Sequence, residues 1–197
     1  FHLQHEPMVQ EIIRSGADIV CFSADKLLGG PQGGIICGRK EYLNRIRKDP
    51  MYRTFRVGKI TLTILQSTLL FYLQGRAQVS LPAWKMISMS YKDISRRCNS
   101  LARKLNKRGV SVSCQDGFSV VGGGSLPGKT LPTRLLCIES KGSIEALDQR
   151  LHLSVPAVLG RVKDGYLFLD PRTIEPRHDK KLIELICSAY QNEDEVI

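Results

Sequence analysis

A lysine in a glycine-rich turn is the residue of this chain best placed to do chemistry. Lys26 follows an apolar run, residues 18–23, and a turn rich in glycine leads from it to a second apolar run, residues 34–38. A lysine amine at the edge of a cleft loses its proton more easily when it is partly desolvated, and the free amine forms an imine with a carbonyl group. Glycine allows positive φ and close approach of the backbone to a ligand. The segment therefore indicates imine chemistry, with a surface lysine in a plain loop between two strands as the alternative.

The elements around Lys26 are expected to form an α/β layer. The apolar runs at residues 18–23 and 34–38 have strand length, and such runs suit strands that are buried on both faces. Helices are expected at residues 6–14, 39–47 and 59–74. The alternation of strand and helix is typical of an α/β domain.

The second half of the chain is expected to open on one long amphipathic helix. This helix spans residues 83–107, after the break at Leu81-Pro82, and Gly109 ends it. Asp164-Gly165 predicts a tight hairpin turn. Shorter elements are expected as strands at residues 110–114, 118–121, 134–139, 157–162 and 166–170, and as helices at residues 144–151 and 179–190. A domain boundary is placed near residue 78.

The net charge of the chain limits the classes of binding partner, and its cysteines limit the kinds of covalent and metal site. Lys and Arg number 29 against 19 Asp and Glu, a net charge of +10, which favours nucleic acid, phosphorylated ligands or anionic membranes. Six cysteines without a CxxC pair argue against a disulfide framework and a zinc site, and indicate a reducing, cytoplasmic setting. No metal site and no membrane span are expected. Much of the positive charge lies in residues 85–108, where Asp93 is the one acid beside Lys85, Lys92, Arg96, Arg97, Arg103, Lys104, Lys107 and Arg108.

The sequence around Lys26 resembles that of a known protein family. Residues 22–34 read Phe-Ser-Ala-Asp-Lys-Leu-Leu-Gly-Gly-Pro-Gln-Gly-Gly, and the cofactor-lysine segment of the bacterial selenocysteine synthase family typically reads Phe-Ser-Gly-Asp-Lys-Leu-Leu-Gly-Gly-Pro-Gln. Residues 6–10 (Glu-Pro-Met-Val-Gln), 121–127 (Val-Gly-Gly-Gly-Ser-Leu-Pro) and 156–162 (Pro-Ala-Val-Leu-Gly-Arg-Val) resemble other landmarks of that family. The resemblance runs from the first residues to about Thr173.

The resemblance implies a fold and a cofactor. The fold would be the α/β fold of the fold-type-I pyridoxal 5'-phosphate (PLP)-dependent transferases, similar to aspartate aminotransferase. Residues 1–78 would end the large PLP-binding domain, and residues 79–197 would form a connecting helix and a small C-terminal α+β domain. Lys26 would bind PLP and act as general acid and base, with Asp25 shaping the site. The residues that hold the cofactor's phosphate and ring would precede Phe1, so the chain is expected to be a C-terminal fragment.

The resemblance also implies a reaction. The family converts seryl-tRNA(Sec) to selenocysteinyl-tRNA(Sec) with selenophosphate, through an aminoacrylyl intermediate. Arg53 and Arg56 match two family arginines that are implicated in holding selenophosphate, and guanidinium groups bind such anions bidentately. The basic segment, residues 85–108, would then contact the tRNA, although a solvated helix face is the alternative. A homo-oligomer is expected.

Two departures and two other functions stay open. Ala24 stands where the family usually has glycine and would be strained if the position needs positive φ, and Gly58 stands where aspartate is usual. One alternative function is a PLP-dependent lyase of the same group that acts on a small amino acid or amino sugar phosphate. The other is a non-catalytic basic fragment that binds RNA.

Overall fold

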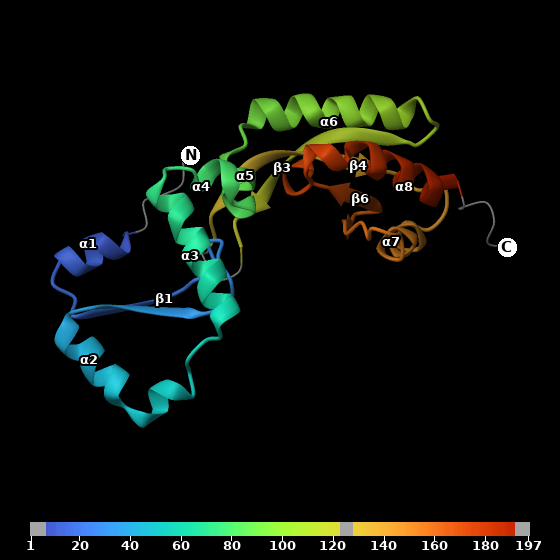
Figure 1. Ribbon diagram of the computed structural model, residues 1–197. Coiled ribbons are helices and arrows are strands. Elements are labelled where there is room, and N and C mark those ends of the chain that lie inside the picture. Colours follow the sequence, from blue (N-terminus) through green and yellow to red (C-terminus); the bar gives the residue numbers. More distant parts are fainter. Residues whose placement is uncertain (1–6, 123–127, 192–197) are drawn as a thin grey trace. The chain divides into compact units, whose positions relative to one another are not determined.

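The chain divides into two compact units (Figure 1). The computed structural model describes residues 7–122 and 128–191, so Glu6 and residues 123–127 of the family-like segments lie outside the described residues. Unit 1 comprises Phe1–Ser88 and Val121–Lys129, and unit 2 comprises Met89–Val120 and Thr130–Ile197. The division of the chain near residue 78 into a cofactor domain and a C-terminal domain stays a prediction.

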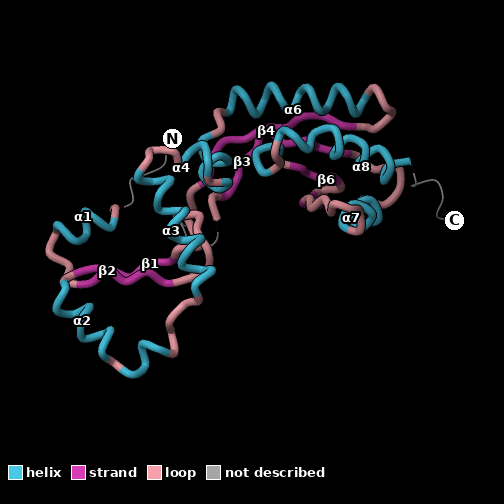
Figure 2. Tube along the Cα trace, in the orientation of Figure 1, coloured by secondary structure: helices cyan, strands magenta, loops and turns pink. Residues whose placement is uncertain are grey.

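Unit 1 holds the glycine-rich turn between two short strands. Its elements are α1 (Val9–Arg14), β1 (Ile19–Ser23), β2 (Gly34–Gly38), α2 (Lys40–Lys48), the 3-10 helix η1 (Pro50–Arg53), α3 (Lys59–Leu73), α4 (Ala77–Ser80) and α5 (Pro82–Ser88). Figure 2 shows the same order of helices and strands along the Cα trace.

Strands β1 and β2 form an antiparallel pair. Their register runs from Ile19 opposite Gly38 to Ser23 opposite Gly34. Side chains along both strands alternate between exposed and half-buried. The expectation of strands buried on both faces is therefore wrong for this chain, because in the described residues one set of alternate positions stays exposed to solvent.

Unit 2 is built on a four-stranded antiparallel sheet. Its elements are α6 (Tyr91–Asn106), β3 (Val112–Val120), β4 (Thr130–Ile138), α7 (Ile144–His152), β5 (Arg161–Lys163), β6 (Tyr166–Leu169), η2 (Pro171–Thr173), η3 (Pro176–His178) and α8 (Asp179–Gln191). The strands are ordered β3-β4-β6-β5 in the sheet.

The predicted hairpin in unit 2 is confirmed. Asp164-Gly165 forms the two-residue turn between β5 and β6, with φ of 50° and 78°. Both positions take the left-handed conformation that a type I′ turn requires.

The expected long helix, residues 83–107, is broken. Helix α5 ends at Ser88 and α6 begins at Tyr91. Ser90 caps α6, because its hydroxyl oxygen accepts a hydrogen bond from the amide of Asp93 at 3.1 Å. A serine three residues before an aspartate is a helix-start signal, and that signal overrides the continuous amphipathic pattern.

The two short strands expected at residues 110–114 and 118–121 are one strand, β3. It pairs with β4 without interruption from Val112 opposite Ile138 to Val120 opposite Thr130. The strand expected at residues 157–162 is limited to β5, which begins at Arg161.

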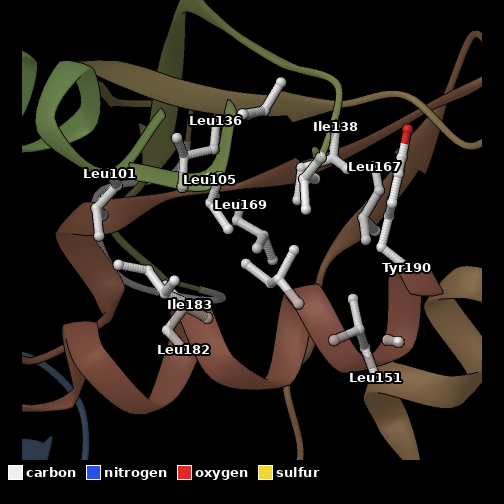
Figure 3. Close-up of a cluster of buried hydrophobic side chains, with 14 of the residues drawn as sticks. Leu101, Leu105, Leu136, Ile138, Leu151, Leu167, Leu169, Leu182, Ile183 and Tyr190 are labelled. Atoms are coloured by element: carbon white, nitrogen blue, oxygen red, sulfur yellow. The ribbon is translucent and has the colours of Figure 1, made fainter. Parts of the chain in front are cut away.

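One apolar core closes unit 2 (Figure 3). Helix α6 contributes Cys98, Leu101 and Leu105, whose spacing puts them on one face of the helix. Leu136 and Leu147 come from β4 and α7, and neither is accessible to solvent. Side chains of α8 complete the cluster, so the sheet and all three helices share one interior.

Candidate functional site

Lys26 lies just after β1, in the loop that joins β1 to β2. Its ammonium nitrogen Nζ lies 3.0 Å from Oδ2 of Asp25 and donates a hydrogen bond to it. The Lys26 side chain is 50% exposed and that of Asp25 is 29% exposed. The amine is therefore accessible to a ligand from solvent and has one charged partner at hand.

Asp25 is held in its charged form. The hydrogen bond from the Lys26 side chain lowers the pKa of Asp25 first, and the hydrogen bond from its own backbone amide lowers it further. Lys26 and Asp25 therefore form an ion pair in the loop that follows β1.

The loop around Lys26 is closed by its own backbone. The Ala24 amide donates to the Gly33 carbonyl at 2.8 Å, the Gly30 amide donates to the Ala24 carbonyl at 2.8 Å, and the Gly29 amide donates to the Lys26 carbonyl at 2.9 Å. Gly29 has a φ of +71°, a conformation that favours glycine. Ala24 is fully buried and is not among the residues with positive φ, so alanine at this position is unstrained.

Two aromatic side chains form hydrogen bonds at the carboxyl side of Lys26 in this loop. Oη of Tyr72 in α3 donates to the Leu28 carbonyl at 2.9 Å and lies 3.3 Å from the Leu27 carbonyl. Nε1 of Trp84 in α5 donates to Tyr72 Oη at 2.5 Å. The sequence gives no signal for these contacts, because Tyr72 lies 45 and 44 residues from Leu27 and Leu28, and Trp84 lies 12 residues from Tyr72.

The two predicted anion-binding arginines follow α2. Arg53 ends η1, and Arg56 lies in the segment before α3; both are exposed. Arg56 lines an open hollow of about 1620 Å³, together with Phe22 and Ser23 of β1. The hollow is only partly enclosed by the described residues.

The structure shows no direct contact of Arg53 or Arg56 with Lys26. No hydrogen bond or ion pair joins Lys26 or Asp25 to Arg53 or Arg56, all four of which are described. Lys26 and Arg53 are not among the residues that line the hollow. The assignment of all four residues to one site stays a prediction.

Gly58 occupies the N-cap of α3, with a φ of −70° and no side-chain cap. A Cβ at this position would meet no atom within 4 Å. Glycine is therefore not required here, and its effect is the loss of a capping acceptor at the start of α3.

The basic segment is less uniform than its sequence. Arg97 turns inward: its Nη1 donates to the carbonyls of Pro171 and Ile174, each at 2.7 Å, and its Nη2 lies 2.5 Å from Oδ1 of Asp179. Arg97 therefore fastens α6 to the start of α8. The exposed basic side chains of residues 85–108 are Lys85, Lys92, Arg96, Arg103, Lys104, Lys107 and Arg108.

Other classes of site are not supported within residues 7–122 and 128–191. No group of three or more His, Cys, Asp or Glu side chains is arranged to hold a metal ion there. The six cysteines are free thiols. Among the described helices, none has both the length and the apolar character needed to cross a bilayer.

Comparison with known families gives a match over most of the chain. Residues 1–175 match the model of the family described as SelA, L-seryl-tRNA selenium transferase. The chain is similar to proteins named L-seryl-tRNA(Sec) selenium transferase. The relative from Desulfomicrobium baculatum is 44% identical over 174 residues, which is 86% of this chain and 37% of the relative. The relative from Solidesulfovibrio magneticus is 39% identical over 198 residues, which is 97% of this chain and 42% of the relative.

The chain spans about two fifths of the length of these curated relatives. Among solved structures it resembles D-glucosaminate-6-phosphate ammonia-lyase, with a TM-score of 0.57 and 18% identity over 92% of this chain and 46% of that one. This likeness concerns the fold. With the family match, it confirms the expected α/β fold of the fold-type-I PLP-dependent transferases.

Proposed function

The chain belongs to the L-seryl-tRNA selenium transferase family, and on that premise we propose that it is part of an enzyme that converts seryl-tRNA(Sec) to selenocysteinyl-tRNA(Sec) with selenophosphate as donor. One observation carries the proposal. The family match spans residues 1–175 and contains an accessible amine, Lys26, in a backbone-bonded loop directly after β1.

We further propose that Lys26 binds pyridoxal 5'-phosphate. The described residues fit the aldehyde of this cofactor: the Lys26 amine is half exposed, and Asp25 is its charged partner. When bound, the cofactor supplies an electron sink for bond changes at the Cα and Cβ atoms of the seryl group. Nζ of Lys26 would take the proton from the seryl Cα and later return one. Asp25 would orient Nζ through its 3.0 Å hydrogen bond.

Arg53 and Arg56 are proposed to bind selenophosphate. Both guanidinium groups are exposed and free to turn toward an incoming anion, and Arg56 lies on the wall of the hollow beside β1. Charge-assisted bonds to such an anion are about twice as strong as neutral ones.

The exposed basic side chains of residues 92–108 are proposed to contact the phosphates of tRNA. Phosphate contacts by Lys and Arg supply most of the sequence-independent affinity for nucleic acid. An enzyme acting on tRNA is expected in the cytoplasm. A homo-oligomer is proposed as well: the exposed apolar side chains of α3, among them Ile60 and Leu73 at 79% and 84% exposure, are a surface for a second subunit or for the rest of the longer protein.

The test is selenium transfer by the full-length protein that contains this chain. Incubation with seryl-tRNA(Sec), selenophosphate and PLP is expected to place labelled selenium on the tRNA, and Lys26→Arg is expected to abolish the transfer. Arg14→Gln, an exposed change in α1, serves as the matched control.

A second function has one observation in its favour, the fold likeness to D-glucosaminate-6-phosphate ammonia-lyase. If the protein leaves seryl-tRNA(Sec) unchanged and releases ammonia from a small amino acid or amino sugar phosphate, the lyase function replaces the selenium transferase function. If it binds RNA in a salt-sensitive way and catalyses neither reaction, the function that stands is that of a non-catalytic RNA-binding fragment.

A further inference from the structure

The hydroxyl of Tyr72 bonds to the backbone on the carboxyl side of Lys26. The backbone bonds within the loop involve Ala24, Gly29 and Gly30. The carbonyls of Leu27 and Leu28, the two residues after the lysine, bond instead to Tyr72 Oη at 3.3 and 2.9 Å. The loop is thus closed by its own amides and tied to α3 by one side chain.

The direction of these bonds is determined by Trp84. An indole N–H is a donor only, so Tyr72 Oη must accept from Trp84 Nε1 and give its own proton to the loop carbonyls. Burial raises the pKa of Tyr72, while the hydrogen bond from Trp84 lowers it. The net rise keeps the hydroxyl protonated, as the bond to Leu28 requires.

The packing beneath the loop is tight on the same side. A Cβ on Gly30 would lie 3.1 Å from the Ala24 carbonyl oxygen and 3.6 Å from side-chain atoms of Leu65 and Thr68 in α3. A Cβ on Gly29 would lie 3.7 Å from the Leu81 side chain. The loop therefore packs against α3 and against Leu81, the residue that precedes α5. The position of its backbone thus depends on the elements that carry Tyr72 and Trp84.

We propose that Tyr72, oriented by Trp84, is a positioning residue that holds the Lys26 loop and thereby aims the lysine amine. The inference rests on the proposed role of Lys26 as the cofactor lysine. A lysine has a flexible four-carbon stem, so the place of its amine depends on how firmly the backbone beneath is held. A displacement of about 1 Å at a reacting group costs roughly 100-fold in rate.

The chain offers a direct probe of this contact, because Trp84 is its one tryptophan. Tyr72→Phe keeps the ring and removes the hydroxyl. A lost hydrogen bond of about 0.5–1.5 kcal/mol corresponds to roughly 2- to 12-fold faster amide exchange. We expect that increase at Gly29 and Gly30, together with a shift of the part of the tryptophan emission that Trp84→Phe removes. Trp84→Phe is expected to give a smaller increase, and Tyr166→Phe in unit 2 none.

The second readout is the rate at which PLP plus borohydride labels Lys26 relative to the other lysines, measured by peptide mass mapping on the full-length protein. Tyr72→Phe is expected to slow labelling of Lys26 at least threefold, whereas Tyr166→Phe is expected to leave that rate unchanged. Unchanged amide exchange in the loop would overturn the inference. Faster exchange with an unchanged labelling rate at Lys26 would overturn it as well. If the wild-type protein is not labelled at Lys26, the proposed function fails and the inference with it, whereas equal labelling of wild type and Tyr72→Phe defeats the inference alone.

Discussion

Unit 2 closes around one apolar core, whereas unit 1 leaves many of its large apolar side chains open. In unit 2, Leu105, Leu136 and Leu147 have no accessible surface. In unit 1, Ile60 and Leu73 of α3 are 79% and 84% exposed. A helix that is apolar around its whole circumference is typical of a buried element, and α3 has that composition.

The closed core and the candidate catalytic residues lie in different units. Lys26, Asp25, Arg53 and Arg56 all belong to unit 1, the unit whose apolar surface is not closed by its own residues. Unit 2 provides a self-contained interior and an exposed basic helix face. Substitutions in the two units are therefore expected to fail in different ways.

The largest expected effect concerns the core. Leu136→Ala in β4 removes a side chain with no exposed surface and is expected to cost about 2–5 kcal/mol of unfolding free energy. The matched change Leu73→Ala in α3 is expected to stay within about 1 kcal/mol, because that side chain is already exposed. Urea unfolding followed by circular dichroism measures both. Equal losses in the two units would remove the contrast between them.

A smaller effect is expected from the inward arginine of α6. Arg97→Met leaves the carboxylate of Asp179 and two carbonyls without their donor, and is expected to cost about 2–3 kcal/mol, since the pair is only partly exposed. Arg96→Met, in the exposed pair with Asp93, is expected to cost less than about 0.5 kcal/mol. RNA binding reverses the order: Arg96→Met weakens it in a filter-binding assay at low salt. A loss of stability with Arg96→Met as large as with Arg97→Met would contradict this division of roles.

In unit 1 the expected change is in function and not in stability. Arg56→Gln in the full-length protein is expected to raise the KM for selenophosphate about tenfold, which equals about 1.4 kcal/mol of lost binding. Its unfolding midpoint is expected to match that of Arg14→Gln, because both side chains are exposed. Steady-state selenium transfer gives the KM, and an unchanged KM would exclude Arg56 from donor binding.

The smallest expected effect is at the start of α3. Gly58→Asp supplies an acceptor for the first amides of the helix and a charge that suits its N-terminus, and is expected to add a few tenths of a kcal/mol. Gly58→Ala supplies no acceptor and is expected to destabilise the helix. Because a Cβ here meets no atom within 4 Å, packing does not contribute to the difference. Thermal unfolding of both variants measures it, and a gain from alanine equal to that from aspartate would rule out capping.

Local patterns in the sequence predicted most elements of the fold. The apolar runs around Lys26 are β1 and β2, and the Asp164-Gly165 turn is a hairpin. The break before α6 was missed, although Ser90 and Asp93 supply the capping signal. Such a signal is short, and a continuous amphipathic pattern runs across it.

Long-range contacts were beyond the reach of sequence reasoning. Arg97 looks like its basic neighbours, and it is turned inward by Asp179, 82 residues away. Tyr72 and Trp84 carry no motif, because their role depends on where α3 lies under the Lys26 loop. The apolar runs and the glycine-rich turn single out Lys26, the family resemblance favours a cofactor lysine over a plain loop lysine, and its partner Asp25 is adjacent in sequence.

The most direct test of the central claim is a map of where PLP attaches. The full-length protein is incubated with PLP, reduced with borohydride and digested, and the labelled peptides are identified by mass spectrometry. The account predicts one phosphopyridoxyl adduct, on Lys26, and its loss in Lys26→Arg. Labelling scattered over many lysines, or no labelling of a folded protein, would contradict the assignment of Lys26 as the cofactor lysine.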